Sequence, residues 1–444
     1  MDTPIYDFLK EYAAAEPLRA HMPGHKGRVH RAEELSVAYS YDLTEISGAD
    51  SLFEAEGIIR KSEINAASLY NTAETVYSCG GSTLCIQAML FLMKQENRLI
   101  LAGRTVHRAF LNACILLGLQ VVWVYPKTEN GILSGKYDPC DFERALRSVN
   151  GKPCCIYITS PDYMGNMADI AALSEVSRRF DAPLLVDNAH GAHLAFFEKS
   201  LHPIALGADL CCDSAHKMLP CLTGCAYLHT SNERYKGRLK AAMGLFGSTS
   251  PSYLMLLSLD LCNVFLAEKA AENIAKIREL AEKMKERLGD KYIFTGGEEP
   301  FHVVIDAASM GIDGRQLGAQ LEEMNCFPEY AGREAVVLLL SAAEREEDME
   351  RLEEILRKCD APVCGEKGIK PPAFPRPKAV MGIREAALSE SEVIAADKAA
   401  GRICAGVKVP CPPAVPIVIS GEMIDENTVE TMLYYGVSAV EVVI

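Results

Sequence analysis

Short apolar runs alternate with helical patterns from about Gly80 to His229. This alternation predicts an α/β unit with a mainly parallel sheet. The expected strands are Arg98–Ala102, Gln120–Tyr125, Cys154–Thr159, Pro183–Asp187, Ala208–Asp213 and Cys225–His229. The expected helices are Thr83–Met93, Val106–Leu117, Asp141–Val149 and Ala168–Phe180.

The pattern changes near Leu256, where a long helical stretch begins and continues through KAAENIAKIRELAEKMKERLG. Its mixed charges and regular apolar spacing predict a connector helix that stops by Gly289. A smaller α/β unit is expected next, with strands at 300–306 and 335–340 and helices at 315–324 and 344–358. The Pro-rich stretch KPPAFPRPK indicates an extended linker, and VSAVEVVI predicts a final strand.

Composition narrows the class of protein. The chain has 444 residues, of which 49% are hydrophobic, and 60 acidic against 45 basic residues give a net charge of −15. This is typical of a globular protein with two or three packed units. No basic stripe is present, so we expect no nucleic-acid partner, whereas a cationic substrate is compatible with the charge.

The compartment can also be anticipated. The start MDTPIYDFLKEY does not resemble a signal peptide, and the longest apolar stretch, Ala113–Val124, is too short to span a bilayer. The sixteen cysteines are scattered as in an intracellular protein with reduced thiols. We therefore expect a cytoplasmic protein without a membrane segment.

Metal binding finds little support in the cysteine and histidine spacing. No CxxC pair occurs, and Cys221 with Cys225 lacks a second ligand pair at zinc-finger spacing. His190 and His193 could act as ligands together with nearby cysteines, but we expect no metal site.

A glycine-serine turn is the first candidate for ligand chemistry. The dinucleotide fingerprint and the phosphate loop of nucleotide-binding proteins are both absent, but Cys79-Gly-Gly-Ser-Thr83 opens an apolar helix. The glycines allow a ligand to approach the backbone, and the helix amides with the Ser82 and Thr83 hydroxyls could bind an anion. A simple helix cap is the alternative interpretation.

The second candidate lies at two strand ends. The strand Pro183–Asp187 ends in a carboxylate, and the strand that ends at Asp213 leads into Ser214-Ala-His-Lys217. In a parallel sheet these ends open into one crevice. Pyridoxal phosphate needs a lysine for a Schiff base and a carboxylate for its ring nitrogen, which Lys217 and Asp187 would supply. A lysine at a strand end can also be merely solvated.

The order of motifs along the chain carries a resemblance. AHMPGHKG, DLTEISGAD, CGGST, RTVHRAF, TSPDYMG, VDNAHGAH, DSAHKMLPCLTG, GSTSPSYLMLLSLD and CPPAVPIVISGE follow one another from about Ile5 to Val443. In this order the chain resembles the ornithine/lysine/arginine decarboxylase family of fold type I pyridoxal enzymes. It is similar to the short, biosynthetic-type branch, for which arginine is the commonest substrate.

The resemblance implies a fold and a domain division. The large domain is expected to be α/β, like aspartate aminotransferase, with a mainly parallel sheet, and to be followed by smaller C-terminal α/β domains. We expect residues 1–70 to contribute to the active site and 71–260 to bind the cofactor. Residues 261–370 would form the connector helix and a small α/β domain, and 371–444 the C-terminal domain.

The resemblance also implies roles for individual residues. Lys217 would form the Schiff base, Asp187 would pair with the pyridine nitrogen, and His107 would stack on the ring. Ala189 would pack against the other face, and His190 would lie where some members place a tryptophan. The expected phosphate ligands are Ser82, Thr83, Ser214 and His216, with Ser248 or Thr249 reaching the phosphate of a partner subunit.

These roles predict a reaction and an assembly. The expected reaction is decarboxylation of a basic amino acid, arginine before lysine before ornithine, to an amine of the polyamine pathway. Lys217 or His107 would return the proton. A homodimer, or an assembly of dimers with shared sites, is expected. An aminotransferase, a carbon–sulfur lyase and a catalytically idle binding partner are the alternatives, although no motif-anchored arginine beyond Arg402 would serve an aminotransferase.

The chain departs from the family pattern near its C-terminus. The tyrosine and glycine of the usual YPPGIP motif are replaced by Cys411 and Ala414. In relatives this part approaches the distal end of the substrate, so the preferred basic amino acid is left open. Glu422, in SGE, is a candidate for binding that end, with a surface role as the alternative.

Overall fold

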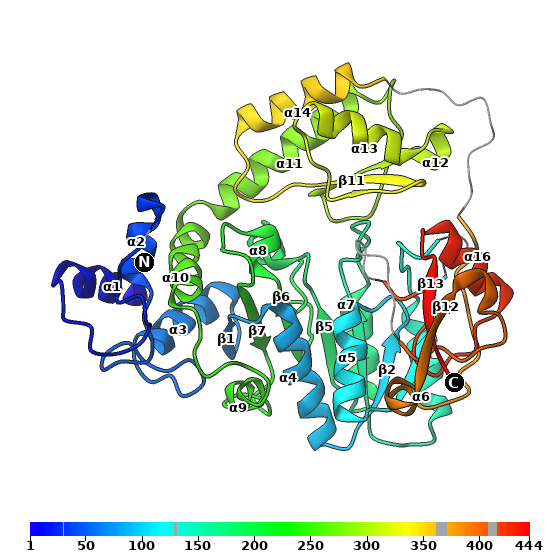
Figure 1. The fold of residues 1–444 in the computed structure, drawn as a ribbon, viewed down its shortest axis with the longest axis horizontal. Coiled ribbons are helices and arrows are strands. Elements are labelled where there is room, and N and C mark those ends of the chain that lie inside the picture. Colours follow the sequence, from blue (N-terminus) through cyan, green and yellow to red (C-terminus); the bar gives the residue numbers. More distant parts are fainter. Residues whose placement is uncertain (30, 128–130, 361–370, 407–414) are drawn as a thin grey trace. The chain divides into compact units, whose positions relative to one another are not determined.

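The computed structural model describes residues 1–29, 31–127, 131–360, 371–406 and 415–444. The chain forms two compact units, each built from separate stretches of sequence. The first contains Met1–Leu92 and Pro183–Ile274, and the second contains Met93–Ala182 and Ala275–Ile444. Figure 1 labels many of the elements of both units.

The first unit contains four strands of the large sheet in the order β1-β7-β6-β5. Strands β5 and β6 are parallel, whereas β7 is antiparallel to both β6 and β1. The strands are β1 (Glu74–Ser78), β5 (Leu184–Asp187), β6 (Leu210–Asp213) and β7 (Ala226–Thr230). All of their residues are buried, as expected for strands covered on both faces.

Helices of the first unit surround these strands. They are α1 (Pro4–Ala14), α2 (Ser36–Tyr41), α3 (Ile58–Tyr70), α4 (Gly81–Gln95), α8 (Ala215–Met218), α9 (Leu239–Gly244) and α10 (Tyr253–Glu268), with 3₁₀ turns at Glu33–Leu35 and Ala192–Phe196. Helix α1 begins at Pro4, and its free Ile5 and Tyr6 amides donate to the buried Asp260 carboxylate on α10, both at 3.0 Å. This cap fixes α1 against α10, and Figure 1 shows the two helices.

The second unit contains strands in the order β4-β2-β3, all parallel. They are β2 (Leu99–Gly103), β3 (Val121–Val124) and β4 (Cys154–Thr159), accompanied by α5 (Arg108–Leu117), α6 (Pro139–Ser148) and α7 (Ile170–Arg179). A four-stranded sheet follows in the order β10-β11-β9-β8. Its elements are α11 (Ala270–Arg287), β8 (Phe294–Thr295), β9 (His302–Asp306), α12 (Ala307–Met310), α13 (Gly314–Glu323), β10 (Tyr330–Ala331), β11 (Ala335–Leu339) and α14 (Glu346–Lys358).

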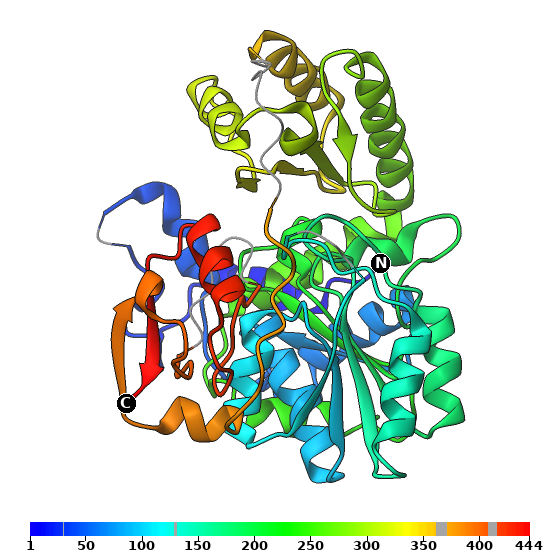
Figure 2. The same cartoon turned by 90° about the vertical axis from the view of Figure 1, so that its right-hand side faces the viewer.

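The C-terminal part of the second unit is a small layer around an antiparallel strand pair, shown in orange and red in Figure 2. Its elements are α15 (Ile383–Leu388), β12 (Ser391–Ala395), a 3₁₀ turn at Ala396–Lys398, α16 (Glu426–Tyr434) and β13 (Ala439–Val443). Buried Val418, Val440 and Val442 pack in one apolar cluster with Ile132 and Leu133. Hydrophobic contact therefore joins this layer to the segment that follows β3.

The sequence predicted most of these elements, and β4 has its predicted bounds. Strand β1 was not predicted, and the expected connector helix is two helices, α10 and α11, separated at Lys269. The direction of β7 also differs from a parallel arrangement. The twelve residues between β6 and β7 contain only the four-residue helix α8, which is too short to carry the chain back along the sheet as a parallel crossover helix does. The expected four-domain division stays a prediction.

Candidate functional site

Two adjacent strand ends bring the main candidate residues together in the first unit. Strands β5 and β6 are parallel, and Asp187, the last residue of β5, lies opposite Cys212. The Asp187 carboxylate is 1% exposed and accepts hydrogen bonds from the Ala189 amide and the Cys212 thiol. Lys217 follows β6 on α8. The predicted neighbourhood of the two strand ends is confirmed.

Lys217 is held by a histidine that the sequence had marked. Its Nζ atom lies 2.9 Å from Nε2 of His190, which is buried and directly follows Ala189. The lysine itself is half-buried. The imidazole therefore fixes the amine on the same side of the sheet as the loop that follows Asp187.

The glycine-serine turn begins α4, as predicted. Gly81 has a φ of +66°, which favours glycine, and a Cβ atom there would meet no atom within 4 Å. The buried Ser214 hydroxyl donates to the Ser82 hydroxyl at 2.8 Å, whereas Thr83 is exposed. The Ser82 and Thr83 hydroxyls therefore lie beside the amides at the start of α4. This arrangement is suited to a phosphate group.

His216 is turned toward the chain that follows it. Its Nδ1 atom lies 3.0 Å from the Cys225 carbonyl oxygen, to which the His216 amide also donates. Partial burial lowers the pKa of His216, and the neighbouring Lys217 lowers it further, against the opposing effect of the carbonyl. The ring is thus favoured in its neutral form.

A buried acid next to the site was not predicted as functional. Asp213, the last residue of β6, accepts hydrogen bonds from Asn188 Nδ2 at 2.8 Å, His202 Nε2 at 3.0 Å and His229 Nε2 at 3.2 Å. Burial by itself would raise the pKa of Asp213, but the two imidazoles lower it below its usual value. Since Asn188 follows Asp187 and Ser214 follows Asp213, this carboxylate ties both strand ends together.

The same cluster contains ligand types that metals prefer. One ligand atom each from His202, Cys211 and Asp213 lies within 4.8 Å of the others. However, Nδ1 of His202 accepts from the Ile204 amide, so its proton is on Nε2 and faces Asp213. Hydrogen bonding accounts for this geometry without an ion.

The remaining predicted residues lie elsewhere. His107 belongs to the second unit, where it is half-buried and its Nδ1 caps α5 by accepting from the Ala109 amide at 3.2 Å. Ser248 and Thr249 are exposed on the first unit. Cys411 and Ala414 lie outside the described residues, so the altered motif is not tested. Glu422 is 1% exposed, which excludes the surface role considered for it.

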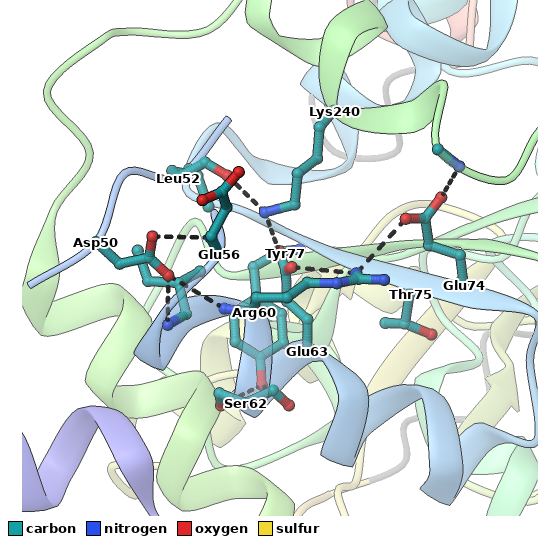
Figure 3. A network of polar contacts seen from close by, with 12 residues as sticks. Asp50, Leu52, Glu56, Arg60, Ser62, Glu63, Glu74, Thr75, Tyr77 and Lys240 are labelled. Atoms are coloured by element: carbon teal, nitrogen blue, oxygen red, sulfur yellow. Dashed lines mark hydrogen bonds and ion pairs between the residues drawn. The ribbon is translucent and has the colours of Figure 1, made fainter. Parts of the chain in front are cut away.

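Thr249 lines an open pocket of about 620 Å³ in the first unit. Arg60 and Lys240 also line it, and beneath them the fully buried Glu63 lies 2.9 Å from Lys240 Nζ and 3.6 Å from Arg60 (Figure 3). Burial raises the pKa of Glu63, against the effect of Lys240. Arg60 and Lys240 are paired with Glu63 inside the protein, so we interpret this network as structural.

The site in the first unit has the groups that one cofactor requires. A buried carboxylate, a lysine amine and a helix start with two hydroxyls fit the ring nitrogen, the aldehyde and the phosphate of pyridoxal phosphate. The structure thus defines an α/β protein of the pyridoxal enzyme class.

Comparison with known proteins identifies the family. The model of the Orn/Lys/Arg decarboxylase major domain matches residues 3–305, and that of the C-terminal domain matches residues 374–440. The chain belongs to the Orn/Lys/Arg decarboxylase family. It is therefore a pyridoxal-phosphate-dependent enzyme that decarboxylates a basic amino acid.

Individual relatives agree with this assignment. The chain is 28% identical to the arginine decarboxylase of Bacillus subtilis (strain 168), over 96% of this chain and 92% of the relative. The structure of the Francisella novicida lysine decarboxylase LdcF matches with a TM-score of 0.82 and 14% identity, covering 100% of this chain and 81% of that one. The constitutive lysine decarboxylase of E. coli matches at 0.78, with 17% identity and coverages of 100% and 82%. The expected fold class is confirmed.

The part of the chain that the structure describes contains no helix with the length and apolar character of a membrane span.

Proposed function

We propose that the enzyme decarboxylates arginine in preference to lysine and ornithine, and that the amine product enters polyamine synthesis. The observation that carries this proposal is the similarity to an arginine decarboxylase over nearly the full length of both chains. The acidic net charge favours the approach of a cationic substrate.

The proposed catalytic centre is Lys217 with Asp187. When bound, pyridoxal phosphate supplies an electron sink for the bond to the departing carboxylate. Asp187, buried at the end of β5, would hold a proton at the pyridine nitrogen. Lys217 would carry the cofactor covalently until the substrate amine displaces it, and His190 would orient the freed amine at 2.9 Å.

The other residues would bind and orient. Ser82, Thr83, Ser214 and His216 are assigned to the phosphate group, with Ser214 already hydrogen-bonded to Ser82. His107 would stack on one face of the ring and Ala189 would pack against the other. Either Lys217 or His107 would deliver the proton that replaces the carboxylate.

We further propose a homodimer, or an assembly of dimers, in the cytoplasm. The exposed hydroxyls of Ser248 and Thr249 are available to a second subunit, whose phosphate site they would complete. The fourteen cysteines that the structure describes are free thiols, which suits a reducing compartment.

A carbon dioxide release assay tests the proposed reaction. Arginine, lysine, ornithine and neutral and acidic amino acids are supplied to the holoenzyme, and the amine is identified by mass, with Lys217→Ala as the control. We expect carbon dioxide and agmatine from arginine at the highest kcat/KM. Formation of a keto acid, sulfide or ammonia without carbon dioxide would replace the proposal by an aminotransferase or a lyase.

A further inference from the structure

A fully buried arginine lies three residues before His107. Arg104 follows β2, and Thr105 and Val106 are the only residues between it and His107, the N-cap of α5. The Arg104 side chain is 0% exposed and lies over the Trp123 ring at 5.3 Å. A charge in such a position must be compensated by polar partners.

The partners of Arg104 come from the C-terminal part of the chain. Its guanidinium donates to the carbonyl oxygens of Pro416 at 2.9 Å and Ile417 at 3.4 Å. It also donates to Oε2 of Glu422 at 3.1 Å. Three acceptors within seven residues thus bind one side chain that precedes the His107 position.

Glu422 is itself held in place by the backbone of neighbouring segments. Its Oε2 atom accepts from the Ile419 amide at 2.9 Å, and its carbonyl oxygen accepts from the Cys404 amide at 2.9 Å. The residue also forms an isolated antiparallel bridge with Ala379. A fixed carboxylate and a planar guanidinium set the direction of the pair, which a hydrophobic contact would not do.

The residue after Arg104 is also tied down. The Thr105 amide and hydroxyl lie 2.9 and 2.8 Å from the hydroxyl oxygen of Tyr137, which burial keeps in its neutral form by raising the pKa of Tyr137 to about 12. Two successive side chains are therefore fixed, and His107 follows with a half-buried ring. The start of the loop that carries His107 is thus held by Arg104 and Thr105, and the His107 ring caps α5.

We propose that the Arg104–Glu422 ion pair is a positioning device, through which the C-terminal domain orients the loop that carries His107. This inference rests on the proposed role of His107. It also assigns Glu422 a role other than binding the distal end of the substrate. Because the Glu422 carboxylate is 1% exposed and already paired with Arg104, a substrate cation would have to enter a closed position and compete with a permanent guanidinium.

The test is a double-mutant comparison in the holoenzyme. Glu422→Gln is made in the parent and in a His107→Ala background, because the amide keeps the size of the carboxylate but not its charge. We expect Glu422→Gln to lower kcat about tenfold with KM within about twofold in the parent, a coupling of the size seen for contacting residues. In the His107→Ala background it should change kcat by less than about twofold.

Two readouts do not depend on turnover. Glu422→Gln should shift the absorbance of the bound cofactor, and it should speed hydrogen exchange of the amides of residues 105–109 in the apoenzyme. Arg104→Lys should reproduce both changes, since an ammonium cannot reach all three acceptors at once. The matched control is Glu392→Gln, which breaks an exposed ion pair with Arg402 on the same domain and should change neither readout.

Three results would overturn the proposal. An equal loss of kcat in both backgrounds would mean that the pair acts independently of His107. A rise in KM for the basic substrate at unchanged kcat would assign Glu422 to substrate binding. Unchanged hydrogen exchange would show that the pair does not order the loop. Should the enzyme release no carbon dioxide, the exchange and absorbance readouts still decide this question separately from the reaction.

Discussion

Two buried acids, one in each unit, show opposite electrostatic behaviour. Asp213 in the first unit and Glu422 in the second are both at most 1% exposed. The pKa of Asp213 is lowered, because two imidazoles outweigh the cost of burial. The pKa of Glu422 is raised, because burial outweighs Arg104.

The difference lies in the number and placement of donors. Asp213 receives hydrogen bonds from three side-chain nitrogens and from the Cys211 thiol, and they reach both of its oxygens. Arg104 and the Ile419 amide both donate to Oε2 of Glu422, and among the described residues Oε1 has no hydrogen-bond partner. A single permanent charge thus stabilises a buried carboxylate less than several well-placed N–H groups do. The carboxylate beside the proposed cofactor site is the better stabilised one.

The largest effect on kcat is expected at Asp187, the last residue of β5. Asp187→Asn should retain the cofactor but lose roughly 10²- to 10³-fold in kcat, because an amide cannot hold the ring proton as a carboxylate does. Turnover and cofactor content are measured together. This loss should exceed that of any change at Glu422. Turnover within a fewfold of the parent would assign the task to another group.

Replacing Asp213, which links the ends of β5 and β6, should mainly lower the free energy of unfolding. In the parent, the imidazoles of His202 and His229 donate to the Asp213 carboxylate. Asp213→Asn can place an N–H group where they need an acceptor, and each buried donor left without a partner costs about 1–3 kcal/mol. We expect a lower unfolding midpoint in denaturant, together with weaker cofactor binding. Glu233→Gln, on the exposed surface of the same unit, is the control. A stability equal to the parent would refute the anchoring role.

The free energy of unfolding should depend on pH in opposite ways through Asp213 and through Glu422. The lowered pKa of Asp213 stabilises the fold above the unfolded value of about 3.9, and this contribution is lost as the pH falls through the folded pKa. The raised pKa of Glu422 gives a contribution that is full below about 4.3 and lost as the pH rises through the folded pKa.

Unfolding of the apoenzyme from about pH 2 to pH 8 measures this contrast. Relative to Glu422→Gln, the parent should lose stability as the pH rises. Relative to Asp213→Asn, it should lose stability only at the acidic end. If the two stability differences change with pH in the same direction, Asp213 and Glu422 do not differ in the way described.

The smallest structural change concerns the exposed hydroxyls of the first unit. A Lys217→Ala subunit mixed with a subunit carrying Ser248→Ala and Thr249→Ala should form hybrids with one normal site, if these hydroxyls serve the partner. Activity above that of either parent variant is the expected outcome. Its absence would restrict each site to one chain.

Local pattern predicted much of the frame but not its long-range contacts. The apolar run Cys154–Thr159 is β4, and Asp187 and Lys217 follow adjacent parallel strands as expected. The direction of β7 depends on the connection before it, whose helix α8 is too short for a parallel crossover. Glu422 follows Ser420 and Gly421, a pattern that suggests a surface turn, and its partner Arg104 is 318 positions away. No short-range signal could have shown that it is buried.

The role of Asp213 was missed for a related reason. Its sequence neighbours suggested only a strand leading to Lys217, whereas its partners His202 and His229 come from a loop and from β7. A charged residue at the end of an apolar strand, with histidines nearby in sequence, is the signal that could have prompted the search.

The most direct test of the account is where the cofactor is attached. Holoenzyme is reduced with borohydride, digested and mapped by mass spectrometry, with Lys240, the paired lysine of the first unit, as an internal reference. The account predicts that pyridoxyl phosphate is found on Lys217. A label on another lysine, or no label in a protein that retains bound cofactor, would contradict it.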